Sequence, residues 1–198
     1  MKLVLASNNA KKLKELGEIL TPLGWELIPQ GQLGVPETEE PHCTFVENAL
    51  EKARHASRLT GLPALADDSG LCVDAFGGDP GVQSARYAGE PRSDARNNEK
   101  LLAELSRLGE RTDRNARFVS VIVFVRHADD PQPIIAEGEW HGEILAAERG
   151  TAGFGYDPLF YIRELDQTAA QLDAAEKNLR SHRGQALAQL LERLQAHH

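Results

Sequence analysis

The chain has 198 residues, a formal net charge of -8 and a hydrophobic fraction of 41%. This length fits one domain or two small lobes, and the acidic balance excludes a protein that wraps a nucleic acid polymer, because that task needs a basic surface. Cys43 and Cys72 form neither a metal-ligand spacing nor a disulfide framework, and no apolar run approaches the roughly 20 residues of a membrane helix. We therefore expect reduced thiols, no membrane partner and a cytoplasmic location.

Short apolar runs alternate with amphipathic segments in the first third of the chain. They predict, in chain order, a strand at 2–6, a helix at 11–20 that ends in 21–24, a strand at 25–29, a loop at 31–41 and a helix that begins after Thr44. Thr44 and Glu47 have the spacing of a capping box at the start of that helix. Phe45 and the alanines at 49, 53 and 56 form its expected inner face.

The remaining elements follow the same alternation. The patterns predict a strand that ends at Asp67-Asp68 and continues through 71–74, a loop at 77–81, a helix capped by Ser93, strands at 117–126, 133–140 and 159–162, and a closing helix that carries Leu187 to Leu194. This mixture of helices and strands predicts a two-lobed α/β fold with a substrate cleft between the lobes. We treat residues 1–198 as one domain.

Two adjacent carboxylates, Asp67 and Asp68, follow the apolar run 62–66. A carboxylate pair at a buried strand end is costly to desolvate, so it usually binds a cation or transfers protons. Mg²⁺ prefers a few carboxylate oxygens with water and phosphate, and Glu39 or Glu40 could supply a second ligand from the loop. The alternatives are an Asx-type turn for the aspartates and a solvated charge pair for the glutamates.

The segment Ser7-Asn8-Asn9-Ala10-Lys11-Lys12 joins the first strand to the first helix. A turn at a helix N-terminus offers free backbone N–H groups and a positive dipole end, and here two lysines add charge. This combination predicts a phosphate cradle, although the P-loop pattern is absent from the sequence. The alternative is a capped surface helix with two solvated lysines.

Three further groups suit a nucleotide. Lys52 lies on the polar side of its helix and could reach a ligand or pair with a neighbouring acid. In Gly153-Phe154-Gly155-Tyr156-Asp157-Pro158, the aromatic ring could stack on a base and Asp157 could accept a ring N–H, or the segment could be a tight turn with Phe154 in the core. His182 and Arg183 are donors for a keto oxygen or a phosphate, or they only follow the helix cap Ser181.

In combination these motifs closely resemble the Ham1/inosine triphosphate pyrophosphatase family, in its bacterial branch. The resemblance runs from Lys2 to about Leu191 and rests on Ser7-Asn8-Asn9-x-x-Lys12, Thr44-Phe45-x-Glu47-Asn48-Ala49, Ala66-Asp67-Asp68-Ser69-Gly70-Leu71, Pro80-Gly81-x-x-Ser84-Ala85-Arg86-Tyr87, Gly153-Phe154-Gly155-Tyr156-Asp157-Pro158 and Ser181-His182-Arg183-Gly184. It implies a mixed, elongated central sheet, a magnesium-dependent homodimer, and hydrolysis of noncanonical purine triphosphates (ITP, dITP and XTP) to the monophosphate and pyrophosphate.

The resemblance also implies roles for single residues. Asp68 would accept a proton and bind the metal, with Glu39 or Glu40 as the second ligand and Glu39 slightly preferred. The residues that would hold the triphosphate and sugar are Ser7, Asn8, Asn9, Ala10, Lys11, Lys12, Lys52 and Ser69. Those that would hold the base and adjoining groups are Phe154, Gly155, Tyr156, Asp157, Lys177, His182 and Arg183.

The sequence departs from the family pattern in two places. It reads Ser7-Asn8-Asn9 where many relatives read Thr-Gly-Asn, and Asp166-Gln167 where the family often has Gly-Lys. Two alternatives to the proposed activity remain. One is a related pyrophosphatase of the Maf type with another base specificity, and the other is a nucleotide sensor without catalysis, for which Asp68 would have no use.

Overall fold

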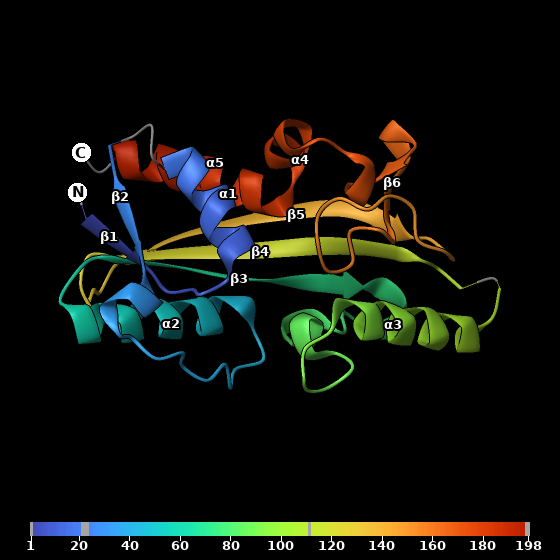
Figure 1. Cartoon of the computed structure of the whole chain (residues 1–198), viewed down its shortest axis with the longest axis horizontal. Helices are drawn as coiled ribbons and strands as arrows, with labels where there is room; N and C mark the ends of the chain where they lie inside the picture. Colours follow the sequence, from blue (N-terminus) through green and yellow to red (C-terminus); the bar gives the residue numbers. More distant parts are fainter. Residues whose placement is uncertain (1, 21–23, 111, 197–198) are drawn as a thin grey trace. The chain divides into compact units, whose positions relative to one another are not determined.

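The computed structural model describes residues 2–20, 24–110 and 112–196 (Figure 1). Their contacts divide the chain into two compact units. Unit 1 contains the chain up to Asp68, residues 120–138 and the chain from Gln185 onward. Unit 2 contains residues 69–119 and 139–184. Each unit has a hydrophobic core of its own.

The strands of the described residues form one mixed sheet in the order β2-β1-β3-β4-β5-β6-β7. β1 pairs in parallel with both β2 and β3, whereas β6 pairs antiparallel with β5 and β7. Their bounds are β1 Lys2–Leu5, β2 Glu26–Pro29, β3 Ala64–Val73, β4 Asn115–Val125, β5 Ile134–Ile144, β6 Phe160–Ile162 and β7 Gln167–Thr168. The predicted α/β class and the mixed sheet are confirmed.

The helices of the described residues agree with the sequence pattern except at one place. They are α1 Ala10–Leu20, α2 Phe45–Thr60, α3 Asp94–Leu108, α4 Ala174–Arg180 and α5 His182–Ala196. Ser93 caps α3 as predicted, since its side chain accepts from the backbone N–H of Arg96. Thr44 caps α2 in the same way, but the Glu47 carboxylate accepts from the Thr44 hydroxyl. The sequence did not predict α4, which is short and mostly exposed.

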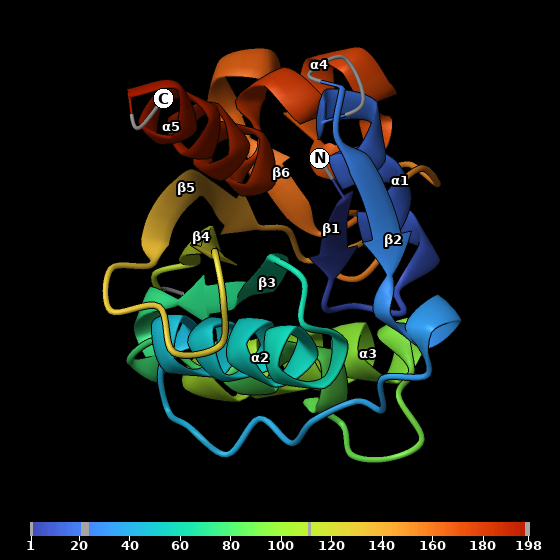
Figure 2. The same cartoon turned by 90° about the vertical axis from the view of Figure 1, so that its left-hand side faces the viewer.

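In unit 1, helices cover both faces of the strands. Figures 1 and 2 show α2 on one face and α1 with α5 on the other. The leucine-rich sides of α1 and α5 pack on the strands of this unit through a buried cluster, which contains Leu3, Leu5, Leu16, Leu20, Leu65, Ile122, Phe124, Leu187, Leu190 and Leu194. On α2 the buried side chains include the three predicted alanines, together with Asn48 and Ser57, whereas Phe45 of the predicted inner face is only partly buried. The small alanines let this helix approach the sheet closely.

In unit 2, α3 lies on one face of the strands and α4 on the other (Figure 1). The core joins the leucines of α3 to aromatic side chains of the strands, including Leu101, Leu105, Phe118, Trp140, Tyr156 and Phe160. Phe118 and Phe160 are in ring contact at 4.4 Å between centroids. The loop that carries Tyr156 is thus fixed to the core by one of its own residues.

Two predicted boundaries are wrong, and one lies outside the described residues. The strand expected to end at Asp67-Asp68 runs through both aspartates as part of the ten-residue β3, which also contains residues 71–73 of the predicted continuation. Lys12 and Ser120 bind the two oxygens of Asp67 and Lys52 binds one oxygen of Asp68, so the strand can carry both buried side chains. The loop expected at 31–41 begins with a 3-10 turn at Gln30–Leu33. The predicted end of the first helix at 21–24 falls mostly in residues 21–23, which are outside the described residues.

Candidate active site

The turn between β1 and α1 is closed by its own side chains. Ser7 Oγ accepts from the backbone N–H of Asn9 at 3.1 Å, and Asn9 Oδ1 accepts from the backbone N–H groups of Lys11 and Lys12 at 3.0 and 3.2 Å. The expectation of free N–H groups is therefore wrong for these three residues, because an asparagine caps the helix instead. The exposed side chains of Asn8, Asn9 and Lys11 are the groups that the turn offers to a ligand.

Asp67 is a deeply buried carboxylate of unit 1, with 2% of its surface exposed. Lys12 Nζ lies 2.7 Å from Asp67 Oδ2, and the Ser120 hydroxyl donates to Asp67 Oδ1 at 2.7 Å. Both oxygens of this carboxylate are thus engaged, one by a cation and one by a hydroxyl. Asp67 holds Lys12 of the predicted phosphate turn in place, and the ion pair and the hydroxyl offset the cost of burying its charge.

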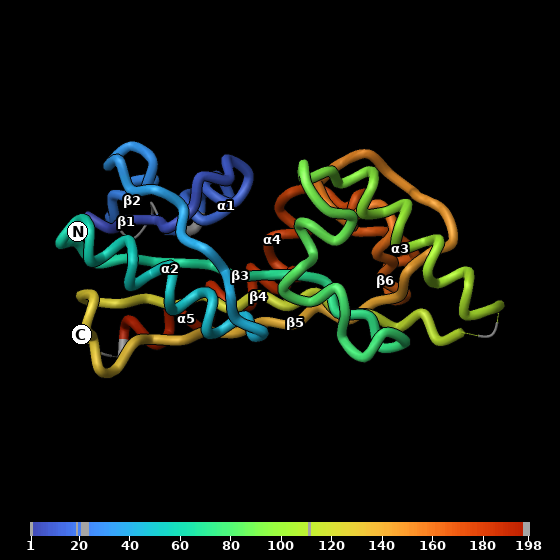
Figure 3. Tube along the Cα trace, turned by 90° about the horizontal axis from the view of Figure 1, so that it is seen from below, coloured from blue at the N-terminus to red at the C-terminus, as the bar shows by residue number. Residues whose placement is uncertain are grey.

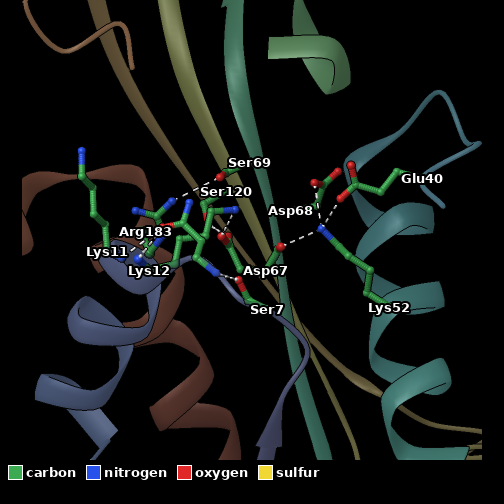
Figure 4. A network of polar contacts seen from close by, with 11 residues as sticks. Ser7, Lys11, Lys12, Glu40, Lys52, Asp67, Asp68, Ser69, Ser120 and Arg183 are labelled. Atoms are coloured by element: carbon green, nitrogen blue, oxygen red, sulfur yellow. Dashed lines mark hydrogen bonds and ion pairs between the residues drawn. The ribbon is translucent and has the colours of Figure 1, made fainter. Parts of the chain in front are cut away.

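Lys52 lies between two other carboxylates (Figure 4). Its Nζ donates to Glu40 Oε1 at 2.7 Å, to Asp68 Oδ1 at 3.1 Å and to the backbone carbonyl of Asp67 at 2.9 Å. These three acceptors match the three protons of an ammonium group. One cation therefore already joins a loop glutamate to a strand aspartate, which are the two elements from which the sequence predicted metal ligands.

The pKa directions at this cluster have clear causes. Burial raises the pKa of the Asp68 carboxyl above its ordinary value, although Lys52 opposes the effect. Burial acts to lower the pKa of Lys52, but the charges of Asp68 and Glu40 outweigh it and raise that pKa. The asymmetry is structural: Lys52 has three acceptors, whereas Asp68 Oδ2 is buried and has no hydrogen-bond partner among the described residues. Asp68 is the carboxylate of this cluster that remains available for chemistry.

Polar side chains tie the glutamate loop, residues 30–44, to its surroundings in unit 1. Asn8 Oδ1 accepts from the backbone N–H of Gly31 at 3.2 Å, and Asn8 Nδ2 donates to Glu37 Oε1 at 3.3 Å. The buried Asn48 exchanges two hydrogen bonds with the backbone of His42, at 3.0 and 3.1 Å. Figure 3 shows this segment running beside α2. The loop is therefore anchored at both ends of the stretch that carries Glu39 and Glu40.

The two glutamates of that loop differ in their setting. Glu40 is partly buried against Lys52, whereas Glu39 is exposed. Among the described residues, no group of three or more His, Cys, Asp or Glu side chains is placed to hold a metal ion. A cation at this cluster would thus have two carboxylates at most, Glu40 and Asp68, and the geometry favours Glu40 over the glutamate preferred from the sequence.

In unit 2, the loop 153–158 is built around the buried Asp157. Its Oδ2 accepts from the backbone N–H of Phe154 at 2.9 Å and from Lys177 Nζ at 2.6 Å. Lys177 also lies over the Phe154 ring, 5.0 Å from its centroid. A Cβ on Gly153 would meet Asp157 Oδ2 at 2.1 Å, and Gly153 has a φ of +75°. The motif therefore needs glycine at this position.

His182 and Arg183 begin α5 and are both buried, at 7% and 4% exposed surface. The His182 ring stacks on Phe118, with centroids 4.9 Å apart. Arg183 donates to Ser69 Oγ at 3.2 Å (Figure 4) and lies 5.9 Å from the centroid of the Phe154 ring. Unit 2 thus groups a half-buried aromatic ring with Lys177 and Arg183, two cationic donors.

Comparison with known proteins identifies the family of the chain. A model of the Ham1 family matches residues 3–193. The dITP/XTP pyrophosphatase of Aromatoleum aromaticum is 66% identical over 193 residues, which are 98% of this chain and 96% of that protein. The corresponding enzyme of Ralstonia nicotianae is 64% identical over 196 residues, with the same coverage. The chain belongs to the Ham1 family. A solved structure of a Ham1 protein from Coxiella burnetii is 50% identical, covers 99% of both chains and superposes with a TM-score of 0.94.

Within this Ham1 chain, the structure groups the predicted residues into two sets. The Ser7–Lys12 turn, Lys52, Asp68 and Glu40 lie in unit 1, while Ser69 and the predicted base-contact residues from Phe154 to Arg183 lie in unit 2. Tyr156 points into its core, where its hydroxyl donates to the Ser84 carbonyl at 2.7 Å. Burial raises the pKa of this phenol. Its place in the motif is that of a structural anchor.

Sequence reasoning missed the residues that orient these sets. Ser120 stands within the apolar run 118–125 and is fully buried. Because a buried hydroxyl needs a hydrogen-bond partner, a lone serine in such a run could have indicated a polar contact there. Asp94 and Asn98 of α3, which are hydrogen-bonded to the Gly155 backbone, gave no such signal, because a polar residue in the first turns of a helix is ordinary. No helix of the described residues is both long and apolar enough to cross a membrane.

Proposed function

We propose that this Ham1 chain hydrolyses noncanonical purine nucleoside triphosphates, namely ITP, dITP and XTP, to the nucleoside monophosphate and pyrophosphate. The relatives named dITP/XTP pyrophosphatase, which match nearly the whole chain, support this assignment. The observation that carries it is the buried Asp68, whose Oδ2 has no hydrogen-bond partner among the described residues. A carboxylate held in this way beside two lysines is suited to proton transfer near phosphate.

We propose magnesium as the cofactor. The residues fit it, because Glu40 and Asp68 already converge on one cation, the Lys52 ammonium, and hard carboxylate oxygens are the ligands that Mg²⁺ prefers. When bound, the ion would neutralise part of the triphosphate charge. Glu40 and Asp68 would hold it, and the remaining positions would be left to water and phosphate oxygens.

The residues of unit 1 divide the work on the phosphate chain. The attacking water forms a bond to the α-phosphorus and gives its proton to Asp68, while the anhydride bond between the α- and β-phosphates breaks and pyrophosphate leaves. Lys12, fixed by Asp67 at 2.7 Å, and Lys52 supply positive charge to the leaving pyrophosphate. The helix N-terminus at Ala10 adds the positive end of its dipole.

The residues of unit 2 are suited to the base. The Phe154 ring offers a stacking surface, and base–aromatic stacking is worth about 1–3 kcal/mol. His182 and Arg183 offer donors that match a 6-keto oxygen, so adenine would present its amino group to donors and leave them unpaired, which costs roughly 1–3 kcal/mol each. These donors therefore predict a preference for ITP over ATP.

A panel of triphosphates tests the proposal directly. Pyrophosphate release from ITP, dITP, XTP, GTP and ATP is measured with and without Mg²⁺. We expect turnover of the first three only with the metal, and monophosphate as the second product. Release of inorganic phosphate with IDP would contradict the proposed bond cleavage. Binding without any turnover would leave the sensor alternative, and pyrimidine or modified-base substrates would indicate the Maf-type specificity.

We also propose that the protein is a homodimer and acts in the cytoplasm, as the family resemblance implies. Light scattering after size exclusion, at several protein concentrations, tests the first point: a mass near twice the 21.7 kDa of the chain is expected. Fractionation of the source cells tests the second.

A further inference from the structure

We propose that Asn98, with Asp94, is a positioning residue for base recognition. The two side chains lie on α3 and hold the backbone of Gly155, in the middle of the loop that carries Phe154 and Asp157. The inference rests on the proposed function, because it assigns that loop to the base. Neither residue is proposed to touch the substrate.

The geometry is a clamp on one peptide segment. Asp94 Oδ2 accepts from the backbone N–H of Gly155 at 2.8 Å, and Asn98 Nδ2 donates to the Gly155 carbonyl at 3.1 Å. Asn98 Nδ2 also donates to Glu148 Oε1 at 3.1 Å. Residues 94 and 98 are one helical turn apart, so their side chains lie on the same face of α3. One rigid helix therefore binds both polar groups of the Gly155 backbone.

The clamp holds Gly155, whereas contacts of Asp157 and Lys177 already hold the residues on either side of it. Asp157 holds the Phe154 N–H, and Lys177 holds Asp157. Gly155, with a φ of +61°, has the left-handed conformation that favours glycine. Residues that orient a ligand need support to within about 0.5 Å, and a helix supplies such support better than a loop does. Without the clamp, Tyr156 would still hold the loop to the core, but the Gly155 peptide next to Phe154 would lose its hydrogen bonds to α3.

The setting of Asn98 favours a positioning role over simple packing. Only 4% of its surface is exposed, and its Oδ1 has no hydrogen-bond partner among the described residues. A buried amide oxygen without a donor is unfavourable, and an apolar side chain of similar size would avoid that cost. The polar residue is thus explained by what its Nδ2 holds, namely the Gly155 carbonyl and Glu148.

The preceding residue provides a matched control. Asn97 is equally buried, but it holds the segment 84–88: its Oδ1 accepts from the Ala88 N–H at 2.8 Å, and its Nδ2 donates to the Ser84 and Ala85 carbonyls at 3.3 and 3.1 Å. Truncating either asparagine removes the same buried amide from neighbouring positions of the same helix. Of these two asparagines, only Asn98 is hydrogen-bonded to Gly155.

The experiment compares Asn98→Ala, Asp94→Ala, Asp94→Asn and Asn97→Ala in the full-length protein. We expect Asn98→Ala to lower kcat/KM for ITP by at least about tenfold, chiefly through KM, and to reduce the ITP-to-ATP ratio by a similar factor, which corresponds to one lost hydrogen bond. Asp94→Ala, at an exposed position that should not affect folding, should reduce the ratio less. Asp94→Asn keeps an acceptor oxygen and should retain the parental ratio. Asn97→Ala should lower stability and leave the ratio unchanged.

A second readout does not depend on turnover. Hydrogen exchange at the Gly155 amide should accelerate in Asp94→Ala and in Asn98→Ala, and stay at the parental rate in Asn97→Ala. An unchanged ITP-to-ATP ratio in both clamp variants, or an equal loss of all activities, would overturn the positioning role. If the parent protein releases no pyrophosphate from ITP, the proposed function fails, while the exchange rates still report whether the clamp exists.

Discussion

Each unit contains a lysine–aspartate pair of nearly the same length, in a different setting. Lys12 and Asp67 are 2.7 Å apart in unit 1, and Lys177 and Asp157 are 2.6 Å apart in unit 2. The first pair stands beside a second cluster of charge around Lys52. The second pair lies against an aromatic ring and a backbone N–H. The same ion pair thus serves a charge-dense surface in one unit and a stacking surface in the other.

The comparison also shows which carboxylate has an oxygen without a hydrogen-bond partner among the described residues. Asp67 has a partner on each oxygen, and Asp157 Oδ2 has two donors. Asp68 shares Lys52 with Glu40 and has one buried oxygen without a hydrogen-bond partner among the described residues. Carboxylates with complete partners are structural, whereas the incompletely bonded one is the candidate for proton transfer and cation binding.

The largest effect is expected for Asp68→Asn. Loss of a positioned base should lower kcat by at least about 100-fold while the substrate still binds. Near-parental kcat in a folded variant would contradict the assignment. Asp67→Asn is the control on the adjacent residue: it keeps one acceptor oxygen, which can face Lys12, and should retain more activity than Asp68→Asn.

The raised pKa of Asp68 in the parent protein also predicts how the stability of Asp68→Asn depends on pH. Because the pKa of Asp68 is raised in the folded protein, protonation stabilises the fold below the ordinary aspartate pKa, and this contribution is lost as the pH rises through the raised value. Asparagine cannot ionise. In the absence of metal, Asp68→Asn should therefore be at least as stable as the parent at neutral pH, with the difference vanishing in acid. Denaturant unfolding at both pH values checks it.

The longer elements of the fold were predictable from the sequence because each carries its own periodic pattern, whereas α4 and β7 are too short to show one. The spacing of the leucines predicted α1 and α5, and apolar runs predicted the buried strands. The motifs supplied the candidate site residues that the structure places in units 1 and 2. The sequence could not predict which polar side chains form hydrogen bonds or ion pairs with one another. Nothing local indicates that Lys52 reaches Glu40 in preference to Glu39, or that Ser120, more than fifty positions away, donates to Asp67. Such contacts depend on how distant segments meet in three dimensions.

The second-largest effect is expected for Arg183→Ala in unit 2. If Arg183 reads the 6-keto group, its loss should weaken ITP turnover roughly tenfold to a hundredfold and the ATP background far less. The ITP-to-ATP ratio is the measurement. Loss of both activities in equal proportion would place Arg183 on phosphate or in the structure, and selectivity would then depend on the loop 153–158.

Lys52→Met tests the charge cluster of unit 1 by cation binding. In the parent, a metal must compete with the Lys52 ammonium for Glu40 and Asp68, so removing that charge should tighten Mn²⁺ binding about tenfold, or about 1.4 kcal/mol. Calorimetry or electron paramagnetic resonance without nucleotide measures it. Lys12→Met is the matched control, because Lys12 pairs with Asp67, and its Mn²⁺ affinity should change little. Weaker binding in Lys52→Met would show that the lysine instead holds the ligands in place.

The smallest effect is expected for Ser120→Ala, which removes one donor from Asp67. The Ser120 hydroxyl is fully buried and donates to Asp67 Oδ1 at 2.7 Å. Because the carboxylate keeps Lys12, the loss should cost about 1–3 kcal/mol of unfolding free energy without unfolding the protein. Ser106→Ala on α3 removes a hydroxyl of the same kind from an exposed position, where substitutions usually change stability by less than about 0.5 kcal/mol. Equal stability of the two variants would mean that Lys12 alone holds Asp67, and that the buried hydroxyl adds nothing to the positioning of the phosphate turn.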